Sequence, residues 1–127
     1  MRRSAWHSIA ITLFVLGACG RSLPHIEGVD QAQWKDDKNG CAGRRETMAD
    51  ALLSQKEKLL ALDELDIVDV LGKPDKQELY KRNQKFYLYF LQSGEDCPKS
   101  VQDPRCLKIR FNAMGLAKEV SVDQIGR

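Results

Sequence analysis

The hydrophobic period of the chain changes at Gly72 and Pro74, and this change constrains the fold more than any other feature. Upstream, from Arg44, apolar residues recur at helical spacing, whereas downstream polar and apolar residues alternate. Glycine can take the left-handed conformation that ends a helix, and proline prevents the helix from continuing. Helices therefore precede strands. This order predicts an α+β fold in which two N-terminal helices pack on one face of a three- or four-stranded antiparallel sheet.

Two helices are expected before this break. The first runs from Arg44 to about Leu62. The second begins after Asp63, whose carboxylate can accept a hydrogen bond from the first turn, and ends at Gly72. The apolar faces of the two helices consist of Met48, Ala49, Leu52, Leu53, Leu59, Leu60, Leu65, Val68 and Leu71. We expect both faces to be buried against the sheet.

Strands are expected at 77–81, 85–91, 106–111 and 116–122, with a long polar loop over 92–105. In the second strand, alternation places Phe86, Leu88 and Phe90 on one face and Tyr87, Tyr89 and Leu91 on the other. We expect Tyr87 and Tyr89 to lie on the open face of the sheet, away from the helices. Because tyrosine is enriched at interfaces, these two residues are a candidate interaction face; the alternative is that they are ordinary strand residues.

The N-terminus has the layout of a secretory signal. Arg2 and Arg3 precede an apolar stretch, 5–18, that is shorter than the roughly 20 residues a membrane span needs. The stretch closes in Leu-Gly-Ala-Cys at 16–19, which resembles the lipobox of bacterial lipoproteins. That resemblance implies cleavage before Cys19 and lipidation of its thiol and new amino group. The alternatives are a secreted protein cut elsewhere and an uncleaved membrane anchor.

These features predict three parts of the chain. Residues 1–18 are the lipoprotein signal peptide, 19–43 the lipidated N-terminus and tether, and 44–127 the α+β domain. The tether contains few apolar residues between positions 20 and 29. Asp30 can cap a short helix that reaches Trp34, which we expect to pack at the edge of the domain or to bind a partner.

The charge of the chain argues against nucleic-acid binding. The whole chain carries 20 Lys and Arg against 18 Asp and Glu, a formal charge of +2. Arg2 and Arg3 are the only charged residues before Cys19, so the mature chain would be neutral, with 18 of each sign. A nucleic-acid interface needs a basic patch that neutralises phosphates. The expected partners are instead the membrane, through the lipid, and a protein of the envelope.

Cysteine usage predicts a disulfide. If Cys19 is lipidated, Cys41, Cys97 and Cys106 remain, and an exported protein can keep one bridge. We favour Cys97–Cys106, because these two residues flank one polar loop. A bridge from Cys41 to either of them is the competitor, since it closes a longer loop. No metal or cofactor is expected, because His25 is the only histidine after Cys19 and no Cys-x-x-Cys spacing occurs.

Three local patterns give a family resemblance. They are Val-Asp-Val-Leu-Gly-Lys-Pro at 68–74, Phe-Tyr-Leu-Tyr at 86–89, and Leu-Lys-Ile-Arg-Phe-Asn at 107–112 followed by Gly115. In this order, and behind a lipobox, they resemble the SmpA/OmlA (BamE-like) family of small bacterial lipoproteins over about 59–122. The resemblance implies a two-helix fold with three or four strands and an outer-membrane location facing the periplasm. It also implies a supporting role in β-barrel assembly or envelope integrity. The same fold occurs in secreted β-lactamase-inhibitory proteins.

No catalytic constellation is evident. His25 lies in the predicted tether, no Gly-x-Ser-x-Gly setting exists, and a phosphate-binding glycine loop is absent. The acidic cluster of Asp63, Glu64, Asp66 and Asp69 is explained by the start of a helix, where acids are stabilised. We therefore expect a non-catalytic, anchored protein-interaction module whose partner is the β-barrel assembly machinery or another envelope protein. The alternative is a secreted or anchored inhibitor or ligand-binding protein of similar fold.

Overall fold

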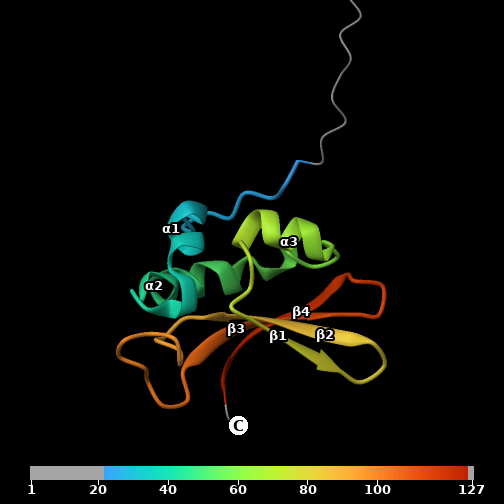
Figure 1. Cartoon of the computed structure of the whole chain (residues 1–127). Helices are drawn as coiled ribbons and strands as arrows, with labels where there is room; N and C mark the ends of the chain where they lie inside the picture. The colour runs from blue at the N-terminus through green and yellow to red at the C-terminus, as the bar shows by residue number, and fades with distance from the viewer. Residues whose placement is uncertain (1–21, 126–127) are drawn as a thin grey trace, which may run out of the picture.

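The computed structural model describes residues 22–125, which form an α+β fold with one antiparallel sheet (Figure 1). Its helices are α1 (Gln31–Asp36), α2 (Arg44–Ser54) and α3 (Glu64–Leu71), with short 3-10 helices η1 (Lys38–Gly40) and η2 (Lys56–Lys58). Its strands are β1 (Lys76–Tyr80), β2 (Gln84–Phe90), β3 (Arg105–Phe111) and β4 (Ala117–Gln124). The predicted α+β class and antiparallel sheet are confirmed. The signal peptide and Cys19 lie outside the described residues.

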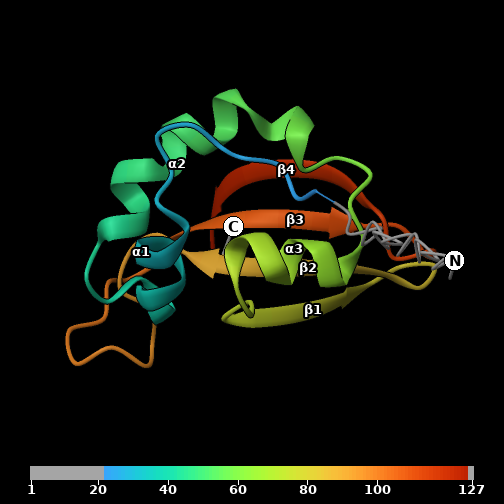
Figure 2. The ribbon, with the colours of Figure 1, turned by 90° about the horizontal axis from the view of Figure 1, so that it is seen from above.

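The sheet is a simple meander in which every strand pairs with the next in sequence, in the order β1-β2-β3-β4 (Figure 2). Arg82 and Asn83 turn the chain between β1 and β2 with positive φ angles of 58° and 59°. In register, Tyr87 of β2 lies opposite Ile109 of β3, which lies opposite Val120 of β4. Because directly opposed residues share a face, these three side chains form one row across the sheet.

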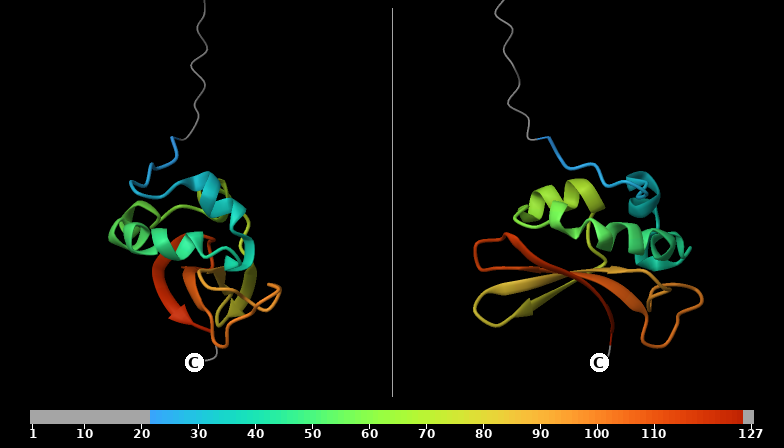
Figure 3. Two further views of the ribbon diagram at one scale, coloured as in Figure 1. Left: turned by 90° about the vertical axis from the view of Figure 1, so that its left-hand side faces the viewer. Right: turned by 180° about the vertical axis from the view of Figure 1, so that it is seen from behind.

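The three α-helices lie on one side of the sheet (Figures 1 and 3), and helices and sheet share one core. From the helical layer the core contains Ile26, Val29, Trp34, Met48, Ala49, Leu52, Leu59, Ile67, Val70 and Leu71. From the sheet it contains Tyr87, Tyr89, Leu91, Leu107, Ile109, Phe111, Ala117 and Val120. The opposite side of the sheet has no helix among the described residues.

The first predicted helix is shorter than expected, because α2 ends at Ser54 rather than near Leu62. The segment before α1 crosses the end of α2 and is held there by Gln55. Its side-chain amide donates to the Glu27 carbonyl at 2.7 Å, and its side-chain oxygen accepts from the Glu27 amide at 3.0 Å. The chain continues through η2 and turns at Ala61, whose φ is 67°. No glycine or proline marks this break, so the sequence pattern missed it.

The core begins earlier than the predicted domain boundary at residue 44. Ile26 and Val29 are buried, so the tether cannot extend to residue 43. Asp30 caps α1 as predicted, since its carboxylate accepts a hydrogen bond from the Gln33 amide at 3.1 Å. Trp34 is fully buried against Tyr89 and Arg45, which excludes a role as an exposed partner-binding aromatic.

A buried ion pair joins the helical layer to the sheet. The Arg45 guanidinium donates to the Asp75 carboxylate at 2.6 Å and to the Trp34 carbonyl at 2.7 Å. It lies 5.5 Å from the Trp34 ring centre and 5.6 Å from that of Tyr89, which are distances typical of cation–π contacts. Asp75 also accepts hydrogen bonds from the Phe90 and Asn39 amides. The buried charges are therefore paired and hydrogen-bonded, as burial requires.

The disulfide joins Cys41 to Cys97, so the favoured pairing of Cys97 with Cys106 is wrong and Cys106 is a free, buried cysteine. The reason is the direction of the side chains. Cys106 points from β3 to the side of the sheet away from the helices, where it packs with Leu88 and Phe90. Cys97 lies in the long loop, which folds back on η1 through a 3.0 Å hydrogen bond from the Gly94 amide to a carbonyl of η1.

Candidate interaction surface

Tyr87 and Tyr89 do not form an exposed face. Both point toward the helices and are buried in the core, so their assignment as a candidate interaction face is wrong. The Tyr89 hydroxyl donates to the Gly72 carbonyl at 2.8 Å, and the Tyr87 hydroxyl donates to the Glu64 carboxylate at 2.8 Å. Each tyrosine thus buries its ring and uses its hydroxyl to fix one end of α3.

The opposite alternation defines the exposed side of the sheet, which we call the open face. From β1 to β4 it consists of Lys76, Glu78, Tyr80, Gln84, Phe86, Leu88, Phe90, Cys106, Lys108, Arg110, Glu119, Ser121 and Asp123. Its composition varies from strand to strand. Aromatic and aliphatic residues predominate on β2, cations on β3, and acidic and hydroxyl groups on β4.

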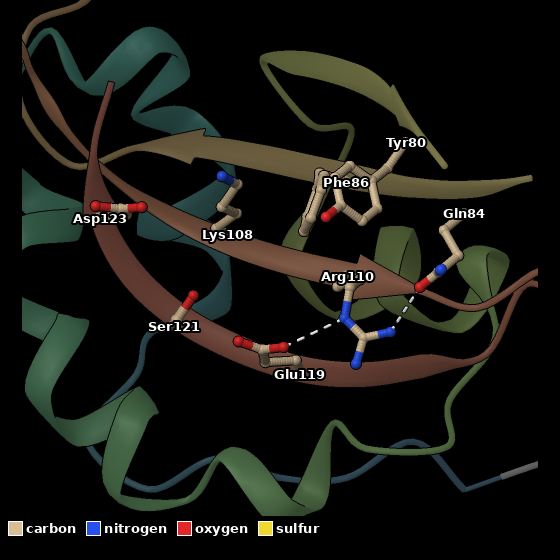
Figure 4. Close-up of a pocket in the computed structure, with 8 residues that line it drawn as sticks. All are labelled: Tyr80, Gln84, Phe86, Lys108, Arg110, Glu119, Ser121 and Asp123. Carbon is tan, nitrogen blue, oxygen red and sulfur yellow. Dashed lines mark hydrogen bonds and ion pairs between the residues drawn. The ribbon is translucent and has the colours of Figure 1, made fainter. Parts of the chain in front are cut away.

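A groove of about 330 Å³ crosses the open face between the ends of β1 and β4 (Figure 4). One wall is aromatic, since the rings of Tyr80 and Phe86 meet edge to face with centres 5.2 Å apart. The Lys108 ammonium lies 4.6 Å from the centre of the Phe86 ring. The far wall carries Ser121 and Asp123. The groove therefore offers an apolar surface, a cation and hydrogen-bonding groups within one hollow.

The two cations of the groove differ in what they already bind. Arg110 donates to Gln84 at 2.8 Å and to Glu119 at 3.2 Å, so its guanidinium ties the start of β2 to β4 (Figure 4). Lys108, in contrast, forms no ion pair with any residue between 22 and 125. Arg110 is consequently part of the framework, whereas the Lys108 ammonium is available to an external carboxylate.

Cys106 lies beneath the open face rather than on it. It is 1% exposed and packs in a small apolar cluster with Leu88, Phe90, Phe86 and Ile125. Burial raises the pKa of its thiol to about 11, and the negative charge of Asp123 acts in the same direction, although Lys108 opposes both. The thiol therefore stays protonated at neutral pH, which makes it a packing residue rather than a nucleophile.

The acidic cluster at the start of α3 has structural contacts. The Asp63 carboxylate accepts a hydrogen bond from the Asp66 amide at 2.8 Å and caps the helix as predicted. Burial of the Glu64 carboxyl would raise its pKa, but hydrogen bonds from Lys85 and Tyr87 outweigh this effect and hold the pKa below its usual range. Within residues 22–125, no three His, Cys, Asp or Glu side chains lie together as a metal site would require.

The structure therefore defines an α+β protein with a half-covered sheet and a polar, aromatic groove on its uncovered side. Comparison with protein-family models, with curated proteins and with solved structures found no match in any of the three. Among the described helices, none has both the length and the apolar character that a membrane span requires.

Sequence reasoning missed the groove residues because it assigned the wrong face of β2 to the helices. The signal was present, because alternation along 106–111 places the charged residues Lys108 and Arg110 on the side opposite Leu107 and Ile109. Phe86 lies opposite Arg110 in the register and must share its face. Pairing β2 with β3 in register would thus have placed Phe86, rather than Tyr87, on the exposed side.

Proposed function

We propose that this protein is a non-catalytic lipoprotein of the bacterial envelope, anchored through Cys19, that binds a protein partner on the open face of its sheet. The observation that carries this proposal is the groove, which combines an edge-to-face aromatic pair with the ammonium of Lys108, for which residues 22–125 provide no ion-pair partner. Aromatic residues are enriched in the contact regions of protein interfaces. This cation favours a partner segment that carries a carboxylate next to an apolar side chain.

The anchor part of the proposal rests on the Leu-Gly-Ala-Cys sequence at 16–19 and its resemblance to a lipobox. We further propose that the fold is BamE-like, with the helices on one face of the sheet, and that the protein faces the periplasm from the outer membrane. The partner would then be the β-barrel assembly machinery or another envelope protein. These assignments rest on the patterns at 68–74, 86–89 and 107–112.

A charge reversal in the groove tests the partner site. The acylated protein would be purified in mild detergent from the membranes of cells that express it, with and without Lys108→Glu. We expect the wild-type chain to retain a protein partner and Lys108→Glu to lose it, because a partner carboxylate would then meet a like charge. Lys99→Glu is the matched control, since Lys99 is exposed in the distant 92–104 loop. Equal retention by both variants would refute the assignment of the groove.

Deletion of the gene tests the envelope role. We expect greater sensitivity to vancomycin and to detergents, because a defective outer membrane admits both. Complementation with the wild-type gene should restore resistance, and complementation with the Lys108→Glu gene should not. Unchanged sensitivity after deletion would count against a role in envelope integrity.

The alternative function is that of a secreted or anchored inhibitor or ligand-binding protein that acts through a loop. It is favoured by the 92–104 loop, which extends from one end of the sheet (Figure 1) and is fixed by the Cys41–Cys97 bridge. Val101 is half-exposed on this loop. Under this alternative, Val101→Asp would abolish partner binding and Lys108→Glu would not, so the same purification separates the two functions.

A further inference from the structure

We infer that one end of the helical layer of the anchored domain contacts the bilayer, so that the open face points away from the lipid. This end comprises the start of α3 and the β3–β4 turn, and we call it the membrane end. The inference rests on the proposed lipidation of Cys19. It concerns the orientation of the domain, which the proposed function leaves open.

The first argument is the length of the tether. The domain holds the chain from His25 onward: the His25 carbonyl accepts a hydrogen bond from the Lys58 ammonium at 3.0 Å, and Ile26 is 1% exposed. Only five residues separate Cys19 from His25, and an extended chain over these six Cα–Cα steps spans at most about 22 Å. A domain of this size has a radius of gyration of about 13 Å, hence a diameter on the order of 30 Å. The tether is therefore shorter than the domain is wide.

The second argument is the place where the chain joins the domain. The first described residues run over the helical layer, on the side opposite the open face (Figures 1 and 3). To turn the open face toward the bilayer, the tether would have to pass around the whole domain, and its length does not allow this. The anchor consequently holds the helical side close to the lipid surface.

The third argument is the chemistry of the membrane end. Leu65 on α3 and Met114 in the β3–β4 turn are 75% and 83% exposed, although Leu65 was expected in the buried stripe of its helix. The two segments are adjacent, since Asp63 and Leu116 form a β-bridge. Leu23, the first apolar residue before the domain, is also exposed. Exposed aliphatic side chains at the end of the helical layer where the described chain begins (Figures 1 and 2) suit insertion into a lipid surface.

Charge does not direct this contact. Glu64, one of the carboxylates at the start of α3, is paired with Lys85 at 2.8 Å, and the Asp63 carboxylate accepts a hydrogen bond from the helix backbone. The mature chain as a whole is neutral. We therefore expect docking to depend on the anchor and the aliphatic side chains, and to be insensitive to the fraction of anionic lipid.

Tryptophan fluorescence on vesicles tests the orientation. The acylated protein, purified from membranes, would be reconstituted into vesicles of phosphatidylethanolamine and phosphatidylglycerol with brominated acyl chains, which quench nearby indoles. Leu65→Trp and Met114→Trp report on the membrane end, and Tyr80→Trp is the matched control on the open face. Trp34 is the only natural tryptophan after Cys19, and its burial makes it a constant background.

We expect quenching and a blue shift for Leu65→Trp and Met114→Trp, none for Tyr80→Trp, and the same result when the phosphatidylglycerol fraction is changed. Quenching of Tyr80→Trp alone, or of none of the three, would overturn the inference. If none of the three variants is quenched, the exposed side chains of the membrane end would instead be assigned to contact with a protein partner. Mass spectrometry of the Cys19 peptide comes first: its lack of acyl chains would overturn both the inference and the proposed anchor. An acylated but unquenched protein would overturn the orientation alone.

Discussion

At the scale of single residues, Arg45 has an unusual role, because a small domain with a thin core buries a full charge at its centre. The guanidinium binds the Asp75 carboxylate, the Trp34 carbonyl and, at 3.4 Å, the Phe90 carbonyl. These three acceptors belong to the segment just before β1, to α1 and to the end of β2, whereas Arg45 itself lies in α2. The sequence around position 45 gave no sign of this role, since a charged residue early in a helix normally faces solvent. Its buried contacts all come from segments distant in sequence.

Removing the Arg45 side chain should therefore be costly. We expect Arg45→Met to lower the free energy of unfolding by about 3–5 kcal/mol, because Asp75 is left as an unpaired buried charge. The exposed neighbour provides the control: Arg44→Met should change stability by less than about 0.5 kcal/mol. Adding Asp75→Asn to Arg45→Met should restore part of the loss. Urea unfolding followed by circular dichroism measures these three variants and Asp75→Asn alone, and a loss in the double variant equal to the sum of the two single losses would contradict this account.

The contacts of Glu64 lead to a prediction about how the stability of the fold depends on pH. Its pKa is lowered in the folded state from its ordinary value of 4.5, so the unfolded chain takes up its proton first as the pH falls. The contribution of Glu64 to stability is thus present above about pH 4.5 and is lost below it. Glu64→Gln should flatten the decline of stability between about pH 7 and about pH 3, measured as the urea midpoint. Glu57→Gln, at an exposed position on η2, should leave the decline unchanged.

At the scale of secondary-structure elements, features set by the local sequence pattern could be predicted, whereas features set by tertiary contacts could not. Alternation located the strands, and the expected strand over 106–111 nearly coincides with β3. The caps of Asp30 and Asp63 were also predictable, because a cap depends on residues three positions apart. The end of α2 was not predictable, since it depends on contacts of Gln55 with a segment 28 residues away in sequence.

The assignment of the sheet faces failed for a related reason. Both faces of β2 are apolar, so alternation shows that two faces exist without showing which one the helices cover. The candidate interaction face was therefore attributed to Tyr87 and Tyr89, which the helices bury. The prediction of the disulfide pairing failed for the same reason, because the nearness of Cys97 and Cys106 in sequence did not indicate that Cys106 points to the side of the sheet opposite the helices.

The Cys41–Cys97 bridge gives a prediction at this scale. It joins positions 56 residues apart and fixes the 92–104 loop to the helical layer. We expect Cys41→Ser with Cys97→Ser to lower the free energy of unfolding by about 2–4 kcal/mol, because a long loop of the unfolded chain is no longer closed. Peptide mapping without reduction should still detect the bridge in Cys106→Ala. A bridge lost in Cys106→Ala but retained in Cys41→Ser would contradict the pairing.

At the scale of the whole molecule, the two sides of the sheet have different roles in this account. The helical side contains the core and receives the short N-terminal tether, while the open face carries the groove lined by Tyr80, Phe86 and Lys108. A short anchor on one side and a binding surface on the other would present the groove to proteins away from the bilayer. The small domain would thus separate the groove from the bilayer and also provide the surface that binds the partner.

Site-specific photo-cross-linking in living cells tests this central claim most directly. A benzophenone amino acid would replace Tyr80 on the open face or, as the control, Asp50, which is exposed on α2 in the helical layer. The account predicts a discrete protein adduct from position 80 that disappears when Lys108→Glu is added, and no protein adduct from position 50. A protein adduct from position 50 with none from position 80 would contradict it.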